Sequence, residues 1–454
     1  MLPRLTCYGG VGEIGGNKFL IEDKDTRVLL DFGAGFTEGS DYFDSSISPR
    51  PVNEAGDLFE FDLLPEIPGL YSERALSNTR LKYRGPEVDG IVLSHFHWDH
   101  TGRIGLVDEK IPVYCGKTTA LIHESYSEST KSPLDGHGLK TFRTGDRFRI
   151  GAMEFEPVHV DHSIPGAYGF VVHTSAGVLA YTGDFRFHGP IGSMTKDFVL
   201  AAKKAAPAIL LSEGTRVRRE DRKSNVSEEA VLREAKSALA GTDKLVFSTF
   251  RGNDTDRINT FHEAASSAGR RLVVTMKTAL ILEKLEGDSK LKVPRVGRDV
   301  DVYVRRKKSG RLDDSDYFPW ERRYLAKGLS AEDVRKNQKD VFLHLEVWNF
   351  PELVDIRPDR GGKYIHAATE AYNEEGERED AVIRNWVRHL GFEYRQIHAS
   401  GHAPMNEVGW LVEEVGAKTI VPIHTEHPRL FNAFRRKTPA KLHIPIKGQP
   451  ISLG

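Results

Sequence analysis

Hydrophobic and polar residues alternate over several short segments in the first part of the chain, a pattern typical of β-strands. Helical spacing of hydrophobic positions follows over 227–240 and 256–268. Together these patterns predict an α/β protein in which helices cover sheets. The predicted strands are 18–22, 27–31, 90–93, 153–160, 168–173 and 177–182.

The chain divides into three stretches that differ in composition and in predicted secondary structure. Residues 34–87 are polar and rich in turn-forming residues, and we expect them to form a surface insertion. From about residue 215 to 392 the pattern changes to helix and strand units, after which histidines typical of metal sites return at His398, His402 and His424. Because candidate ligands lie on both sides of this stretch, we expect a first domain at 1–214, an inserted domain at 215–392 and the completion of the first domain at 393–454.

The overall charge excludes one class of nucleic-acid-binding protein. The chain has 454 residues, with 64 Lys and Arg against 65 Asp and Glu, so its formal net charge is -1 and any site for a polyanion must be a local patch. The basic run 305–308 is one candidate, although such runs are more often solvated faces. Cys7 and Cys115 do not make a disulfide framework. No signal peptide or membrane-length apolar run is evident, and we expect a soluble, cytoplasmic protein.

The segment from Ser94 to His100 carries the strongest chemical signal. It reads SHFHWDH and directly follows an apolar predicted strand. His95 and His97 alternate and can point the same way, while Asp99 and His100 reach a neighbouring position. Zinc binds imidazole nitrogen and carboxylate oxygen. The spacing therefore predicts a metal site and not a histidine-rich surface loop.

Three more residues with suitable chemistry lie near the ends of predicted strands. These are His162, Asp184 and His424. Each is a weak signal alone, since an isolated histidine is more often structural, but together they form a constellation with the first motif. We expect the nearby His159 to be structural.

The glycines between Gly10 and Gly15 fit the dinucleotide-binding pattern GxGxxG. That motif requires a helix directly after the glycines. Residues 17–22 instead alternate like a strand. A tight β-turn near the floor of an active site fits the sequence better than a nucleotide loop.

The ordered set of motifs resembles the metallo-β-lactamase superfamily. Within it, Glu213, the segment His398–Ala403 and the glycine loop 9–15 are similar to the branch with an inserted β-CASP domain, and to the ribonuclease J family. The stretch 364–375 resembles archaeal members. The resemblance implies an αββα sandwich with an inserted α/β domain. The chain departs from bacterial members in three ways. Bacterial members continue into a further C-terminal domain, and the 34–87 segment is longer here. In addition, Arg251-Gly252-Asn253 replaces a Ser-Asn-type turn.

The resemblance also implies roles for individual residues. His95, His97 and His162 would hold one Zn²⁺; Asp99, His100 and His424 a second; and Asp184 would bridge the two, with Mn²⁺ or Mg²⁺ as substitutes in vitro. Asp31 would orient a ligand imidazole. In catalysis, alongside Asp99 and Asp184, His402 would donate a proton to the leaving oxygen and Glu213 would fix its tautomer. The phosphate-binding residues would be His398, Ser400, Gly401 and His402.

The implied function is zinc-dependent hydrolysis of single-stranded RNA, 5′ to 3′ with an endonuclease activity also open, in RNA decay or processing. The resemblance allows a homodimer. Three alternatives remain at this point: a single-strand DNA nuclease of the same branch, a hydrolase of small esters or thioesters, and a non-catalytic RNA-binding subunit. The histidine at position 424 favours RNA over DNA, because RNA-acting relatives end their metal site with this residue type.

Overall fold

The computed structural model describes residues 2–44, 46–219, 226–369, 374–436 and 438–453, and these form two seven-stranded sheets and a six-stranded sheet. The first sheet has the order β20-β1-β2-β3-β4-β5-β6. Its strands are β1 (Arg4–Gly9), β2 (Lys18–Asp23), β3 (Thr26–Phe32), β4 (Gly90–Val92), β5 (Val113–Gly116), β6 (Leu139–Phe142) and β20 (Pro450–Ser452).

The second sheet has the order β19-β18-β11-β10-β9-β8-β7 and packs face to face on the first. Its strands are β7 (Phe148–Ile150), β8 (Met153–His159), β9 (Tyr168–His173), β10 (Val178–Tyr181), β11 (Ile209–Glu213), β18 (Thr419–Ile423) and β19 (Lys441–Leu442).

A hydrophobic core fills the space between these sheets, and helices cover their outer faces. Strand β3 shows how the sequence achieves this, because Val28 and Leu30 point into the inter-sheet core while Leu29 points outward to the helices. The first sheet is covered by α1 (Glu54–Glu60), α2 (Glu73–Leu76), α3 (Trp98–Thr101) and α4 (Lys117–Ser129), and the second by α5 (Gly192–Ala205) and α13 (Met405–Val415). The predicted αββα sandwich is confirmed.

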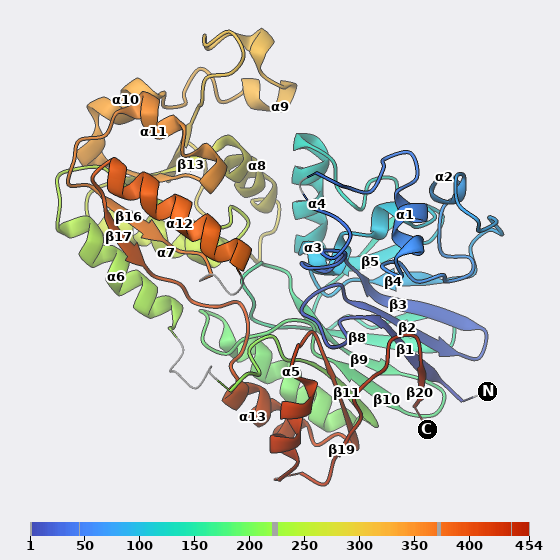
Figure 1. Ribbon diagram of the computed structural model, residues 1–454. Helices are drawn as coiled ribbons and strands as arrows, with labels where there is room; N and C mark the ends of the chain where they lie inside the picture. The colour runs from blue at the N-terminus through green and yellow to red at the C-terminus, as the bar shows by residue number, and fades with distance from the viewer. Residues whose placement is uncertain (1, 45, 220–225, 370–373, 437, 454) are drawn as a thin grey trace.

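The third sheet lies in a separate lobe, at the upper left of Figure 1, and has the order β14-β13-β15-β12-β16-β17 with every neighbouring pair parallel. Its strands are β12 (Val246–Thr249), β13 (Arg271–Thr275), β14 (Val300–Tyr303), β15 (Val341–His344), β16 (Lys363–His366) and β17 (Glu393–Gln396).

Helices cover both faces of this parallel sheet, as its buried strands require. The helices of this lobe are α6 (Glu228–Ala240), α7 (Thr255–Ser267), α8 (Met276–Leu285), α9 (Pro319–Arg322), α10 (Ala331–Lys336), α11 (Glu352–Ile356) and α12 (Glu374–His389). Short 3₁₀ turns occupy Ile104–Leu106, Asp314–Asp316, Gln338–Asp340, Val347–Asn349 and Pro428–Arg436.

The expectation that residues 34–87 form a surface insertion is wrong in part. Leu58, Phe59, Leu70 and Tyr71 of this segment are buried against the outer face of the first sheet. The segment is polar on average, but its few large apolar side chains supply a layer of core.

The limits of the predicted domains stay a prediction, although the third sheet extends beyond residue 392 because β17 pairs with β16 as far as Gln396. Within the 364–375 stretch, residues 370–373 lie outside the described part of the chain. In the described ranges no helix has the length and apolar character needed to span a membrane.

Candidate metal centre

The predicted ligands lie where strands of the two packed sheets end. The loop from His95 to His100 follows β4, Asp184 follows β10 and His424 follows β18. Strands β10, β11 and β18 are parallel, as are β3 and β4, so their carboxyl ends meet at common edges of the two sheets. His424 has a left-handed backbone with φ 51°, a conformation that non-glycine residues adopt chiefly where the surrounding fold enforces it.

Three imidazoles converge in the first part of the site. Nδ1 of His97 lies 3.0 Å from Nε2 of His95 and 3.1 Å from Nε2 of His162. His162 donates its Nδ1 proton to the carbonyl oxygen of Gly401 at 2.6 Å, which leaves a lone pair on Nε2. Burial, followed by the charge of Arg251, lowers the pKa of His97 to about 3. Burial also lowers the pKa of His95 and His162 well below the usual value.

Two aspartates and two histidines form the second part of the site. One oxygen of Asp99 lies 2.8 Å from Nε2 of His424 and 3.4 Å from Nε2 of His100. Although burial favours neutral imidazole, Asp184 and Asp99 raise the pKa of His424 to about 9. Burial likewise opposes a charged His100, but Asp184, Asp99 and Asp31 raise its pKa well above the usual value.

Asp184 lies at the centre of both parts. Its Oδ2 is 3.2 Å from Nε2 of His100, 3.6 Å from Nε2 of His424 and 3.8 Å from Nε2 of His95. Burial alone would raise the pKa of Asp184, yet His424, His100 and His402 hold it well below the usual range. A single carboxylate oxygen therefore faces both groups of nitrogen atoms.

The donor set fits bound metal. His95, His97 and His162 form one group, and Asp99, His100, Asp184 and His424 a second, with ligand atoms within 4.8 Å of one another in each. Three buried neutral imidazoles that aim nitrogen atoms at one point cannot all be satisfied by each other's protons. The neighbouring group concentrates carboxylate charge that favours a cation. Neutral imidazole and ionised carboxylate are the forms that bind metal.

Asp31 lies behind the ligands. Its carboxylate accepts hydrogen bonds from the backbone N–H and hydroxyl of Ser94, both at 2.7 Å, from the hydroxyl of Tyr181 at 2.6 Å and from Nδ1 of His100 at 2.8 Å. These donors occupy its oxygens, so Asp31 fixes the tautomer of His100 and aims Nε2 at Asp99 and Asp184. This is the arrangement by which carboxylates orient metal-binding imidazoles.

A histidine–glutamate pair lies beside the cluster. Nδ1 of His402 is 3.1 and 3.2 Å from the two oxygens of Glu213 and 3.8 Å from Asp184. Glu213 is fully buried and also accepts from the backbone N–H of Phe185 and the hydroxyl of Thr215. Thr215 in turn lies 2.8 Å from Nδ1 of His424. Sequence reasoning missed this threonine, although it lies two residues after Glu213.

The proposed phosphate-binding residues do not all face the cluster. The carbonyl oxygen of Gly401 contacts the cluster by accepting a hydrogen bond from Nδ1 of His162. The hydroxyl of Ser400 accepts a hydrogen bond from the backbone N–H of His402. His398 instead contacts Ala367 and Thr369 of the inserted lobe. Burial lowers the pKa of His398 to about 3, so its imidazole carries no charge to attract a phosphate near neutral pH.

Comparison with known proteins agrees with this geometry. A family model described as a β-lactamase superfamily domain matches residues 61–238. Ribonuclease J from Sinorhizobium meliloti is 25% identical over 442 residues, which cover 93% of this chain and 68% of the relative. Ribonuclease J from Helicobacter pylori strain J99 is 21% identical over an alignment that covers 98% of this chain and 58% of the relative. Ribonuclease J2 from Bacillus subtilis is 25% identical over an alignment that covers 93% of this chain and 69% of the relative.

The chain is therefore similar to the β-lactamase superfamily domain over residues 61–238 and to ribonuclease J proteins over most of its length. It spans 58 to 69% of the length of these three relatives. A crystal structure of a protein of unknown function from Enterococcus faecalis V583 shares the fold over 100% of both chains, with a TM-score of 0.76 and 19% identity.

Two further expectations at the site are confirmed. The glycines from Gly10 to Gly15 lead into strand β2 and not a helix, and a Cβ on Gly15 would lie 3.0 Å from Cβ of Asp99. This loop therefore forms part of the floor of the site. His159 stacks on Tyr168 with centroids 4.9 Å apart and belongs to neither ligand group, as expected of a structural residue.

Proposed function

We propose that this protein is a metal-dependent ribonuclease that hydrolyses phosphodiester bonds of single-stranded RNA. The observation that carries the proposal is the convergence of six candidate ligand side chains around a seventh, Asp184, with the His402–Glu213 pair directly beside them. A binding subunit without catalysis would not need the full ligand set together with an adjacent proton-transfer pair.

Two Zn²⁺ ions are the cofactors that we propose. One ion would be held by His95, His97 and His162. The other ion would be held by Asp99, His100 and His424, and Asp184 would contact both ions. A pair of such ions lowers the pKa of a bound water and neutralises charge on the phosphoryl group.

The chain's own residues complete the reaction. Glu213 accepts the Nδ1 proton of His402, so Nε2 is the atom that exchanges a proton with the departing 3′ oxygen. Only 22% of the His402 side chain is exposed, and a general acid held in this way contributes roughly 10²–10⁴-fold to the rate. Arg186 and His188 donate to the carbonyl oxygen of Ser400 and hold the loop that carries His402.

A basic edge of the inserted sheet supports a polymeric substrate. Arg251, Lys277 and Glu346 each lie two residues after a strand of this parallel sheet, and ligands bind outside the carboxyl ends of such strands. This edge faces the metal centre. Nζ of Lys277 lies 4.4 Å from the ring centroid of Tyr126 in α4, and the charge of Arg251 acts on His97.

Exposed aromatic rings accompany these cations. Trp348, two residues after Glu346, is 70% exposed, and Trp98, between two proposed ligands, is 55% exposed. Cations that track phosphates and rings that stack on bases bind single strands without reading their sequence. Within the basic run 305–308, Lys307 is paired with Glu321, while Arg305 and Arg306 are exposed.

Substitution of the proton donor tests the proposed activity. His402→Ala is expected to keep the fold and the bound metal but to lower RNA cleavage at least 100-fold, and Asp99→Ala to remove cleavage together with metal. The matched control is His389→Ala, an exposed histidine at the end of α12. Full activity of His402→Ala would overturn the mechanism.

A time course on single-stranded RNA labelled at either end, with a 5′ mono- or triphosphate, distinguishes the mode of attack. We expect mononucleotides to appear first from the 5′ label. Internal fragments at the outset would instead indicate endonuclease activity. Faster cleavage of a matched single-stranded DNA would favour the DNA nuclease.

A further inference from the structure

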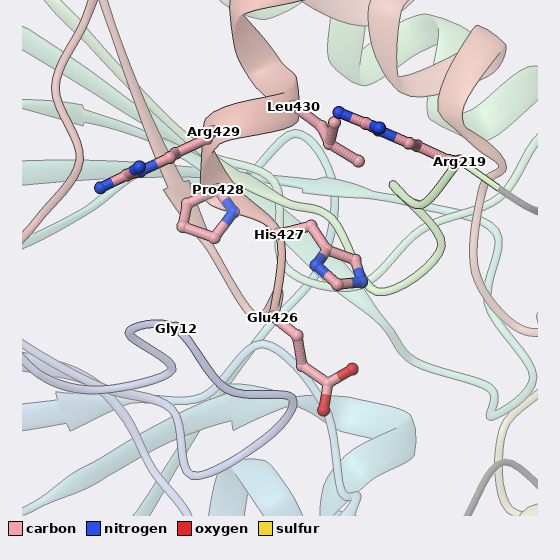
Figure 2. Close-up of a pocket in the computed structure, with 7 residues that line it drawn as sticks. All are labelled: Gly12, Arg219, Glu426, His427, Pro428, Arg429 and Leu430. Atoms are coloured by element: carbon pink, nitrogen blue, oxygen red, sulfur yellow. The ribbon is translucent and has the colours of Figure 1, made fainter.

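A pocket of about 500 Å³ opens beside the loop that follows His424, and Figure 2 shows the side chains around it. Its wall comes from Gly12 in the loop between β1 and β2, from Arg219 after β11, and from residues 426–430 after β18. We call it the His424 pocket. Its volume lies in the range of roughly 300–1,000 Å³ that is typical of small-molecule sites.

The three segments that line the His424 pocket are also those that hold His424. The carbonyl oxygen of Gly10 accepts from the backbone N–H of His424 at 2.8 Å. The hydroxyl of Thr215 lies 2.8 Å from Nδ1 of the same histidine. The third segment begins at Glu426, two residues beyond His424. The wall of the pocket is therefore formed by the same segments that position His424, one of the proposed metal ligands.

The chemistry of the wall suits a nucleotide. Arg219 and Arg429 are exposed, and among the described residues no ion pair or hydrogen bond engages either guanidinium. Free guanidinium groups bind phosphate through paired hydrogen bonds. Glu426 is the one carboxylate among the described residues that line the pocket, so the two arginines leave this part of the wall with net positive charge.

The remaining wall residues offer apolar contact. Pro428 and Leu430 lie between the polar side chains in Figure 2, where a base or ribose can pack against them. Gly12 has φ +70°, and no heavy atom lies within 4 Å of the place where its Cβ would be. The glycine thus leaves the side of the pocket next to the β1–β2 loop unobstructed.

We propose that the His424 pocket binds a nucleoside monophosphate unit, with its phosphate on Arg219 and Arg429 and its base against Pro428 and Leu430. The unit is either one nucleotide of a strand held at the metal centre or a free mononucleotide. This inference rests on the proposed ribonuclease function and deepens it, because it assigns a subsite outside the residues that bind metal or transfer protons.

Arginine substitutions test the pocket on the metal-loaded full chain. AMP binding is measured by titration calorimetry, and KM by cleavage of a 10-nucleotide single-stranded RNA, for Arg219→Ala, Arg429→Ala and the double variant. Loss of a charge-assisted hydrogen bond predicts a rise of about tenfold in Kd per arginine. Arg429→Lys should recover part of the affinity, and Glu426→Gln should tighten AMP binding. The matched control is Arg335→Ala, an exposed arginine on α10.

Each outcome has a distinct meaning. Arginine-dependent AMP binding with an unchanged KM for RNA supports a site for a free mononucleotide, and a raised KM for RNA supports a site for the strand. If RNA is cleaved but no arginine variant changes Kd or KM, the inference is overturned and the proposed function stands. If AMP binds through the arginines but RNA is not cleaved, the proposed function fails and the nucleotide site remains.

Discussion

The carboxylate of Asp31 shows how a residue outside the proposed ligand set can fix the orientation of a residue within it. It is fully buried, and its φ of 55° turns the chain so that both oxygens face Ser94, Tyr181 and His100. The hydrogen bond to Nδ1 of His100 leaves Nε2 for the cluster. The orientation of the ligand thus depends on a strand distant in sequence from its own loop.

Asp31→Asn is expected to lower metal affinity about 10–100-fold, the usual cost of losing a carboxylate behind a metal-bound imidazole. The amide keeps the size of the side chain but replaces an acceptor oxygen with an N–H₂ group. Competition with a chromogenic chelator measures the affinity, and Asp301→Asn, in a half-exposed ion pair of the inserted lobe, is the control. An unchanged affinity would contradict this role.

Glu346 gives the protein a predictable pH dependence. Burial raises its pKa to about 7, despite the opposing charges of Lys277 and Arg305, whereas an unfolded chain has a value near 4.3. The folded state therefore holds this proton more tightly. Its contribution to stability is complete below about pH 4 and is lost as the pH rises toward 7, by up to about 4 kcal/mol.

Glu346→Gln should accordingly match the wild type in unfolding free energy near pH 4 and exceed it at pH 8. Urea denaturation at several pH values measures the difference. Glu229→Gln, on a side chain that is 80% exposed, should change neither value. A constant difference between the two proteins at all pH values would show that Glu346 does not titrate in this window.

At the scale of elements, the loops that follow strands carry the chemistry, and their backbone geometry matters as much as their side chains. Gly15 has φ +85°, and an added Cβ would approach Asp99 Cβ to 3.0 Å and the ring of Phe36 to 3.2 Å. The loop between β1 and β2 thus packs directly on a proposed ligand. Sequence alone indicated a tight turn here but not which residue it touches.

Gly15→Ala is expected to weaken metal binding, because the new methyl group displaces Asp99. Gly85→Ala separates this effect from backbone strain, since Gly85 has φ +82° and open space around its Cβ position. Both variants should lose about 1–2 kcal/mol from left-handed backbone strain, but only Gly15→Ala should lose metal. The metal content of each variant after gel filtration distinguishes displacement of Asp99 from backbone strain alone.

At the scale of the molecule, a buried arginine joins the two lobes. Arg186 is fully buried and binds Asp161 beside the metal centre at 2.8 Å, Asp256 of the inserted lobe at 2.6 Å and the carbonyl oxygen of Ser400 at 3.2 Å. The segment that carries His402 is therefore positioned by both lobes at once. A second contact between the lobes is made where α4 packs against α8 (Figure 1).

Asp256→Ala is expected to destabilise the protein by about 3 kcal/mol, because it leaves a buried guanidinium short of one partner. It should also raise KM for RNA, since Arg186 no longer fixes the Ser400 loop. Asp301→Ala removes an ion pair with exposures of 43% and 29% and should cost no more than about 1 kcal/mol. Equal midpoints of urea denaturation for the two variants would contradict the prediction.

The sequence by itself determined the local features. The ligands from His95 to His100 follow one strand within a few residues, so their spacing alone fixes their proximity. The helix predicted from 227 begins at Glu228 because Ser227 caps it by accepting from the N–H of Ala230. Short-range hydrogen bonding and side-chain periodicity suffice for such features, and the positions of Asp184 and His424 near the ends of predicted strands made them candidate partners.

Only the tertiary structure decided how distant segments meet. The burial of Phe59 and Tyr71, the approach of Lys277 to Tyr126 and the link from Arg186 to Asp256 each depend on packing between elements far apart in the chain. The His424 pocket likewise needs three separate segments. Such contacts are set by the shapes of whole sheets and helices, which no local pattern of residues encodes.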